Sequence, residues 1–71
     1  MNRVNIGKRL VSLRGKRPQW EVASAVGISQ NALSMYERGE RIPRDEIKIR
    51  IAAYYGADVQ SIFFEEKEHE M

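Results

Sequence analysis

The chain has 71 residues, contains no cysteine and carries a formal net charge of +2. This length allows one small domain, and the composition excludes a disulfide framework, a thiolate metal site and, with a single histidine, a histidine-rich metal site. Residues 1–50 hold eleven Lys/Arg against five Asp/Glu (net +6), whereas residues 51–71 hold one against five (net −4). The basic part indicates a polyanionic partner, which for a domain of this size points to nucleic acid.

The first predicted helix runs from about Val4 to Arg14, and Gly7 is expected in its first turn. The chain has no apolar run long enough to cross a membrane or to form a secretory signal. Gly15 follows this helix, as glycine commonly does because it adopts a left-handed conformation without strain. The apolar residues of the helix lie on one face, at helical spacing: Ile6, Leu10 and Leu13.

The second helix is predicted from Pro18 to Val26, with proline at its first helical position, where a missing N–H costs nothing. The third begins after Ser29, whose hydroxyl can cap the helix, and it ends at Gly39. Both helices have short apolar stripes, formed by Val22, Ala23 and Val26 in the second and by Leu33 and Tyr36 in the third.

Two patterns compete in the next segment. Ile47, Ile49 and Ile51 alternate with basic residues, which is typical of a strand, but no other segment reads as a strand that could pair with it. We therefore predict a helix with Pro43 at its first position and Gly56 at its end, and with Ile49 at the edge of the buried face. A fifth helix is predicted behind an Asp58 cap, with its inward face formed by Val59, Ile62 and Phe63.

Two short helices joined by a turn that contains glycine describe a helix-turn-helix. The segment QWEVASAVGISQNALSMYER, residues 19–38, resembles the helix-turn-helix of the phage-repressor and Cro-like family, the xenobiotic-response-element type. The preceding loop, RGKRPQ, is shorter than the common family version, and a proline replaces the usual polar cap. The residues that meet the apolar or small positions of the motif are Val22, Ala23, Val26, Gly27, Ile28, Leu33 and Tyr36.

The resemblance covers about residues 5–64. It implies an all-α fold, a compact five-helix bundle of the lambda-repressor-like type, in which the start of the third helix enters the major groove of DNA. The base-reading residues would be Gln30, Asn31, Ser34 and Met35. Glutamine and asparagine can each pair with adenine through two hydrogen bonds, and methionine can press on a thymine methyl. For each residue, plain solvent exposure or local packing is the alternative.

Phosphate contacts would position the domain without reading sequence. Gln19 lies at the start of the second helix, and the resemblance implies that its amide contacts the DNA backbone. The other expected phosphate-binding residues are Ser29, Arg38, Arg41, Arg44, Lys16 and Arg17, although each could instead be a solvated surface group. The resemblance further implies that Glu37 points inward and pairs with Arg14, because a buried charge needs a partner.

The aromatic residues have two alternative roles. Trp20 could anchor a partner, but a lid on the small core is the favoured interpretation. Related domains often dimerise through their fifth helix, so the expected dimerisation residues are Val59, Phe63 and Phe64. Four apolar side chains in that helix exceed what one short helix can bury alone.

The sequence has no catalytic constellation, so we expect no enzyme, no cofactor and no metal. We expect residues 1–64 to form a cytoplasmic, prokaryotic or phage DNA-binding domain, followed by a flexible acidic tail over residues 65–71. The predicted function is transcriptional repression by promoter occlusion, as a homodimer on a palindromic double-stranded operator. Three alternatives stay open: activation of polymerase, an antitoxin that also represses its operon, and a protein-interaction module.

Overall fold

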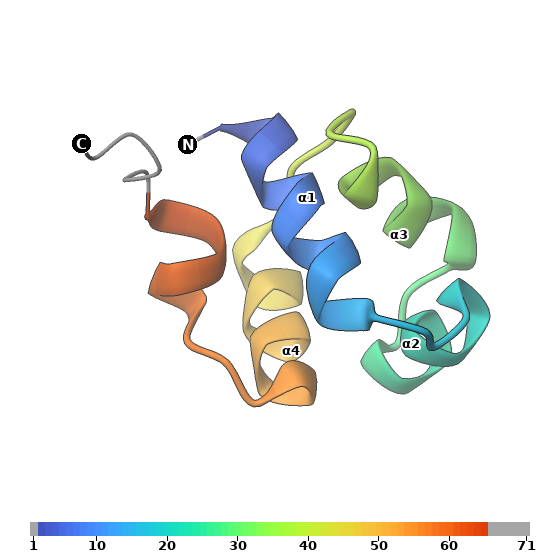
Figure 1. The fold of residues 1–71 in the computed structure, drawn as a ribbon. Helices are drawn as coiled ribbons and strands as arrows, with labels where there is room; N and C mark the ends of the chain where they lie inside the picture. The colour runs from blue at the N-terminus through green and yellow to red at the C-terminus, as the bar shows by residue number, and fades with distance from the viewer. Residues whose placement is uncertain (1, 66–71) are drawn as a thin grey trace.

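The protein is described by a computed structural model over residues 2–65. The expected acidic tail, except for Glu65, lies outside these residues. Within them the chain is all-helical, which confirms the predicted fold class (Figure 1). The elements are α1 (Arg3–Arg14), α2 (Gln19–Val26), α3 (Gln30–Glu37), α4 (Asp45–Tyr55) and a short π-helix, η1 (Gln60–Phe64).

The helices pack around one core. α1 contacts both α3 and η1, and α2 contacts α3 and α4. Figure 1 shows α2 and α3 together at the end of the molecule farthest from both termini. Because α1 spans both ends, it ties this pair to the rest of the bundle. The core consists of Ile6, Leu10, Val22, Ala23, Val26, Leu33, Tyr36, Ile47, Ile51, Ala52, Ile62 and Phe63.

The turn between α2 and α3 depends on Gly27. Its φ of 87° lies in the left-handed region, which favours glycine. The backbone N–H groups of Gly27 and Ile28 both donate to the carbonyl of Ala23, at 2.9 and 3.0 Å. This arrangement closes α2 and reverses the chain within two residues. Ser29 then caps α3, as predicted, by accepting a hydrogen bond from the N–H of Ala32 at 3.0 Å.

Both prolines lie outside the helices that they were expected to begin. Pro18 is the N-cap of α2, in an extended conformation, and α2 begins one residue later. Pro43 is fully buried in the loop, and α4 begins only at Asp45, after the N-cap Arg44. Pro43 therefore packs as a buried loop residue and does not start the helix.

The last helix differs most from its prediction. It begins at Gln60 and has π-helical hydrogen bonding, with the N–H of Glu65 donating to the carbonyl of Gln60 at 2.9 Å. Asp58 contributes its carbonyl, which accepts from Ser61 and Ile62, in place of the expected carboxylate cap. Arg9 of α1 secures the end of η1 by donating to the carbonyls of Ile62 (2.7 Å) and Glu65 (2.5 Å).

Candidate nucleic-acid interface

The N-terminal part of α3 presents two amide side chains to solvent. Gln30 and Asn31 are exposed, and neither has a hydrogen-bond partner within residues 2–65. Leu33 and Tyr36, on the opposite face, are buried in the core, so the orientation of α3 is fixed by packing. The two expected base-reading amides are therefore displayed on a helix that cannot easily rotate, at the end of the molecule formed by α2 and α3.

The C-terminal part of α3 is occupied by contacts within the chain. Ser34 and Met35 are half-buried, and the hydroxyl of Ser34 accepts a hydrogen bond from Arg38 Nη1. Arg38 also forms a two-bond ion pair with Glu40, at 2.9 and 3.0 Å. The hydrogen bond from Arg38 lowers the pKa of the Glu40 carboxyl. Ser34 and Arg38 would contact DNA through the donors that these bonds leave unused: the hydroxyl hydrogen of Ser34 and two guanidinium hydrogens of Arg38.

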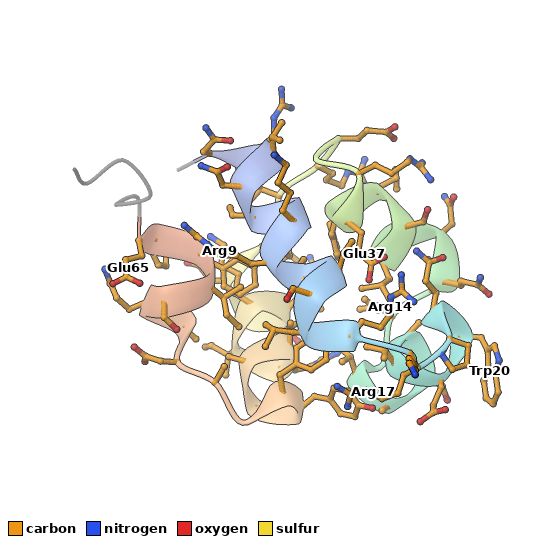
Figure 2. The ribbon with its side chains drawn as sticks, viewed as in Figure 1. Arg9, Arg14, Arg17, Trp20, Glu37 and Glu65 are labelled. Atoms are coloured by element: carbon orange, nitrogen blue, oxygen red, sulfur yellow. The ribbon has the colours of Figure 1, made fainter. Side chains whose placement is uncertain are left out.

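Glu37 joins three helices through one buried carboxylate. Arg14 Nε donates to Oε2 at 2.7 Å and Arg14 Nη2 to Oε1 at 3.0 Å, which is the pairing that the family resemblance implies. Gln19 Nε2, at the start of α2, donates to Oε1 at 2.8 Å. The Glu37 side chain is only 4% exposed, and Figure 2 shows it facing Arg14 between α1 and α3. The three bonds fix the ends of α1 and α3 and the beginning of α2 relative to one another.

This arrangement gives Gln19 a role that sequence analysis missed. Its side chain is half-buried and directed to Glu37, whereas the sequence-based expectation was a contact with phosphate. The amide nitrogen carries a second hydrogen, so the bond to Glu37 positions Gln19 without using its full donor capacity.

Two of the expected phosphate-binding arginines share one surface hollow. Arg41 and Arg44 are exposed and line a surface hollow of about 520 Å³ together with Ser29, the cap of α3. Arg50 of α4, which sequence analysis did not select, lines the same hollow.

Arg17 does not line this hollow. It donates to the carbonyl of Leu13 at 2.7 Å, and its guanidinium lies 5.4 and 5.2 Å from the rings of Tyr54 and Tyr55. The structure therefore places Arg17 with the end of α4, while Lys16 remains exposed in the loop. The tyrosine pair was the available sequence signal, since arginine often stacks on aromatic faces.

Trp20 does not cover the core, so the expected lid is wrong. The residue is 62% exposed, and its side chain extends away from the body of the molecule at the start of α2 (Figure 2). The buried face of α2 is formed by Val22, Ala23 and Val26. These residues lie three, four and seven positions after Gln19, which is the spacing of one helix face. The pattern therefore predicts that Gln19, and not Trp20, lies on the buried face.

Residues 13–62 match the family model described as helix-turn-helix. The chain belongs to the helix-turn-helix family. This confirms the expected resemblance to the Cro-like type. No curated protein matches this helix-turn-helix chain significantly.

Solved structures of transcriptional regulators resemble the helix-turn-helix chain closely. The SOS-response transcriptional repressor LexA from Eubacterium rectale superposes with a TM-score of 0.86 at 21% identity, covering 99% of this chain and 76% of that one. Two structures of the clp gene regulator ClgR from Corynebacterium glutamicum have TM-scores of 0.78 and 0.74. Each is 28% identical over 87% of this chain, and the matches cover 68% and 83% of the ClgR chains. The family and these neighbours support a DNA-binding regulator.

One expected dimerisation residue of this helix-turn-helix protein is misassigned. Phe63 is 1% exposed and belongs to the core, so it cannot contact a second copy without unfolding η1. Phe64 is 43% exposed and Val59 is partly buried. Ile49 of α4, expected at the edge of the buried face, is 61% exposed, and it lines a small hollow with both of them.

Within residues 2–65, no helix is long and apolar enough to span a bilayer.

Proposed function

We propose that this chain binds a specific double-stranded DNA operator and represses transcription by excluding RNA polymerase from the promoter. The observation that carries the proposal is the display of Gln30 and Asn31 at the start of α3, on a helix held by the core and by the Glu37 contacts. Amides at this position can make paired hydrogen bonds with adenine in the major groove. Ser34 and Met35, being half-buried, would contribute smaller contacts.

The basic side chains around α3 would hold the DNA backbone. In the proposed complex Arg41, Arg44 and Ser29 contact phosphates beside the start of α3. Lys16, Gln19 and Arg38 are further proposed phosphate contacts. Arg17 is a weaker proposal, because its donors are bound within the chain. Such contacts set the register of the protein on DNA and make affinity depend on salt.

A homodimer is the proposed binding species. One recognition helix reads only a few base pairs, and two helices related by a two-fold axis would read half-sites about 34 Å apart. The proposed contact between copies is an apolar patch on α4 and around η1, formed by the exposed Ile49 and Phe64 and the partly buried Val59. The domain would comprise residues 1–64.

In vitro selection from a random DNA pool, followed by titration of variants, tests the proposal. Gln30→Ala or Asn31→Ala should weaken binding to the selected site by about 1–3 kcal/mol and leave binding to random DNA nearly unchanged. Gln60→Ala, which removes an exposed amide from η1, is the matched control and should bind like wild type. Failure to enrich any consensus, or equal weakening on both DNAs, would refute sequence-specific reading by α3.

A further inference from the structure

The surface hollow of about 520 Å³ lies between the turn before α3 and the first half of α4. Its charged lining residues are all arginines: Arg41, Arg44 and Arg50. Ser29, at the N-terminal end of α3, and Tyr36 are the hydroxyl-bearing residues of the lining. The hollow thus combines three cationic side chains with a helix N-terminus, and Ile28 and Ile47 are among its apolar walls. This composition suits an anion.

Arg50 reaches across the hollow from α4 to α2. Its Nη1 donates to the carbonyl of Val26, the last residue of α2, at 3.5 Å, and its Nη2 donates to Glu46 Oε2 at 2.7 Å. A Cβ at Gly27 would lie 3.3 Å from Nη1, so the glycine of the turn leaves room for the guanidinium. Arg50 is therefore positioned beside the turn of the helix-turn-helix by two contacts from different helices.

Glu46 neutralises Arg50 without being part of the hollow. It lies one turn earlier on α4, its side chain is 62% exposed, and it is absent from the lining. A guanidinium has five N–H donors and binds phosphate oxygens through two parallel hydrogen bonds. The Glu46 carboxylate holds one of these donors and offsets the guanidinium charge, so it competes with a phosphate in the hollow for Arg50.

We propose that the hollow binds a backbone phosphate of DNA through Arg50, Arg41 and Arg44, and that Glu46 weakens this binding by competing for Arg50. This inference rests on the proposed DNA-binding function. The Ser29 hydroxyl can contribute as well, since its oxygen accepts from Ala32 while its hydrogen remains available for a phosphate oxygen. DNA is favoured over a free phosphate compound because the hollow adjoins the start of α3, where the base-reading amides are displayed.

Affinity for DNA, measured at several salt concentrations, tests the role of Arg50. Arg50→Gln should weaken binding to the selected operator and to random DNA by the same factor. The slope of log affinity against log salt should fall by about 0.9, the value for one phosphate contact. Thermal melts of the variant establish that it is folded. A folded Arg50→Gln protein with unchanged affinity and slope would overturn the proposal while leaving DNA binding by α3 intact.

Glu46→Gln tests the competition and should act in the opposite direction. Removing the carboxylate should strengthen binding to both DNAs about 1.5- to 5-fold, which corresponds to one exposed ion pair. Asp58→Asn, an equal change in charge in the loop between α4 and η1 and outside the lining of the hollow, should have a smaller effect. In an Arg50→Gln background, Glu46→Gln should give no gain beyond that control. Weaker binding by Glu46→Gln, or an equal gain in the Arg50→Gln background, would contradict competition.

Titration with inorganic phosphate distinguishes a free phosphate ion from a DNA backbone phosphate as the occupant of the hollow. Under the proposal, millimolar phosphate perturbs the NMR signal of the Arg50 side chain weakly, and operator DNA perturbs it strongly. Perturbation by phosphate in a protein that enriches no DNA would overturn the assignment to DNA and the proposed function together. Enrichment of an operator that leaves the Arg50 signal unchanged would overturn only the assignment of the hollow.

Discussion

Gly7 of α1 lies directly against the backbone carbonyl of Glu37 in α3. A Cβ at Gly7 would come within 2.4 Å of that carbonyl oxygen, closer than side chains are found in proteins. About two turns later on α1, Arg14 holds the Glu37 carboxylate. α1 therefore contacts the end of α3 at two points, one through backbone and one through side chains. Together these contacts fix the angle at which α3 is presented.

Gly7→Ala should destabilise the protein. Alanine favours a helix interior over glycine by about 0.5–1 kcal/mol, but overpacking of a close helix contact costs about 1–3 kcal/mol. We expect a net loss of about 1–2 kcal/mol in the free energy of unfolding, measured by urea denaturation. Ser12→Ala, at an exposed position of the same helix, is the control and should be nearly neutral. A Gly7→Ala variant as stable as wild type would show that α1 and α3 can separate at little cost.

The Arg14–Glu37 pair should show strong coupling between its two members. Arg14→Met leaves Glu37 with only the Gln19 amide and should cost about 3–5 kcal/mol, the usual effect of leaving a buried charge unpaired. Replacing both residues, as Arg14→Met with Glu37→Leu, should cost less than Arg14→Met alone. A double-mutant cycle by chemical denaturation measures the difference. Additive costs would mean that the pair contributes no coupling energy.

The helices were predictable from local signals. Glycines at the ends of α2 and α4 have positive φ, and the apolar residues of α2 and α3 repeat at helical spacing. These signals depend only on neighbours in the chain. For α4, with its alternating isoleucines, the choice of a helix over a strand also required that no other segment of the chain reads as a partner strand.

Other features depend on contacts between distant segments, which periodicity does not report. Helical spacing predicted an inward Phe63, which is buried, but it did not predict the π-helical turn of η1, whose end is held by Arg9 of α1. Arg50 was missed because its partner on α2 is far away in sequence. Arg17 was assigned to phosphate although its side chain is held by the tyrosines at the end of α4. Charge alone selects basic residues, but the fold decides which of them remain available.

Tyr55→Phe tests how much a buried hydroxyl without a hydrogen bond costs in stability. Its Oη is buried and has no hydrogen-bond partner among residues 2–65. Burial, followed by the nearby Glu37 charge, raises the pKa of the Tyr55 phenol above its ordinary value of 10.0. Tyr55→Phe removes the unsatisfied group, so at neutral pH we expect equal stability or a gain of about 1 kcal/mol.

The raised pKa of Tyr55 also predicts a dependence on pH. The phenol ionises more readily in the unfolded chain than in the folded one. The contribution of the neutral phenol to the free energy of unfolding is therefore complete below pH 10 and is lost as the pH rises through the higher folded pKa. Wild type should therefore lose more stability than Tyr55→Phe between pH 8 and about pH 10.5. Urea denaturation of both proteins at the two pH values measures the difference. An equal loss in both would contradict the raised pKa.

Trp20 is the single tryptophan of the chain and can report DNA binding directly. It is exposed in the first turn of α2, and the first helix of a helix-turn-helix crosses the DNA backbone. We expect operator DNA to reduce quenching of Trp20 fluorescence by acrylamide. Trp20→Phe should bind DNA with the fluorescence response abolished. Unchanged quenching at saturating operator would place Trp20 away from the DNA and make its exposed ring available to another partner.

Dimerisation through the patch of Ile49, Val59 and Phe64 can be tested at Phe64. Phe64 is 43% exposed and is not a core residue, and the centroid of its ring lies 5.0 Å from Lys48 Nζ. Truncation therefore removes a surface contact without opening the core. Phe64→Ala should shift the protein toward monomer in analytical ultracentrifugation and weaken operator binding, while the melting temperature changes little.

Two controls separate association from folding. Val4→Ala, at an exposed apolar position of α1, should leave the dimer intact, because that position lies outside the patch. Phe63→Ala should instead unfold the domain, since a fully buried phenylalanine contributes about 3–5 kcal/mol. If wild type stays monomeric at high concentration and binds its operator as a monomer, the patch is not a dimer contact. Dimers that form only on DNA would still require Phe64, and the operator titration of Phe64→Ala would detect that requirement.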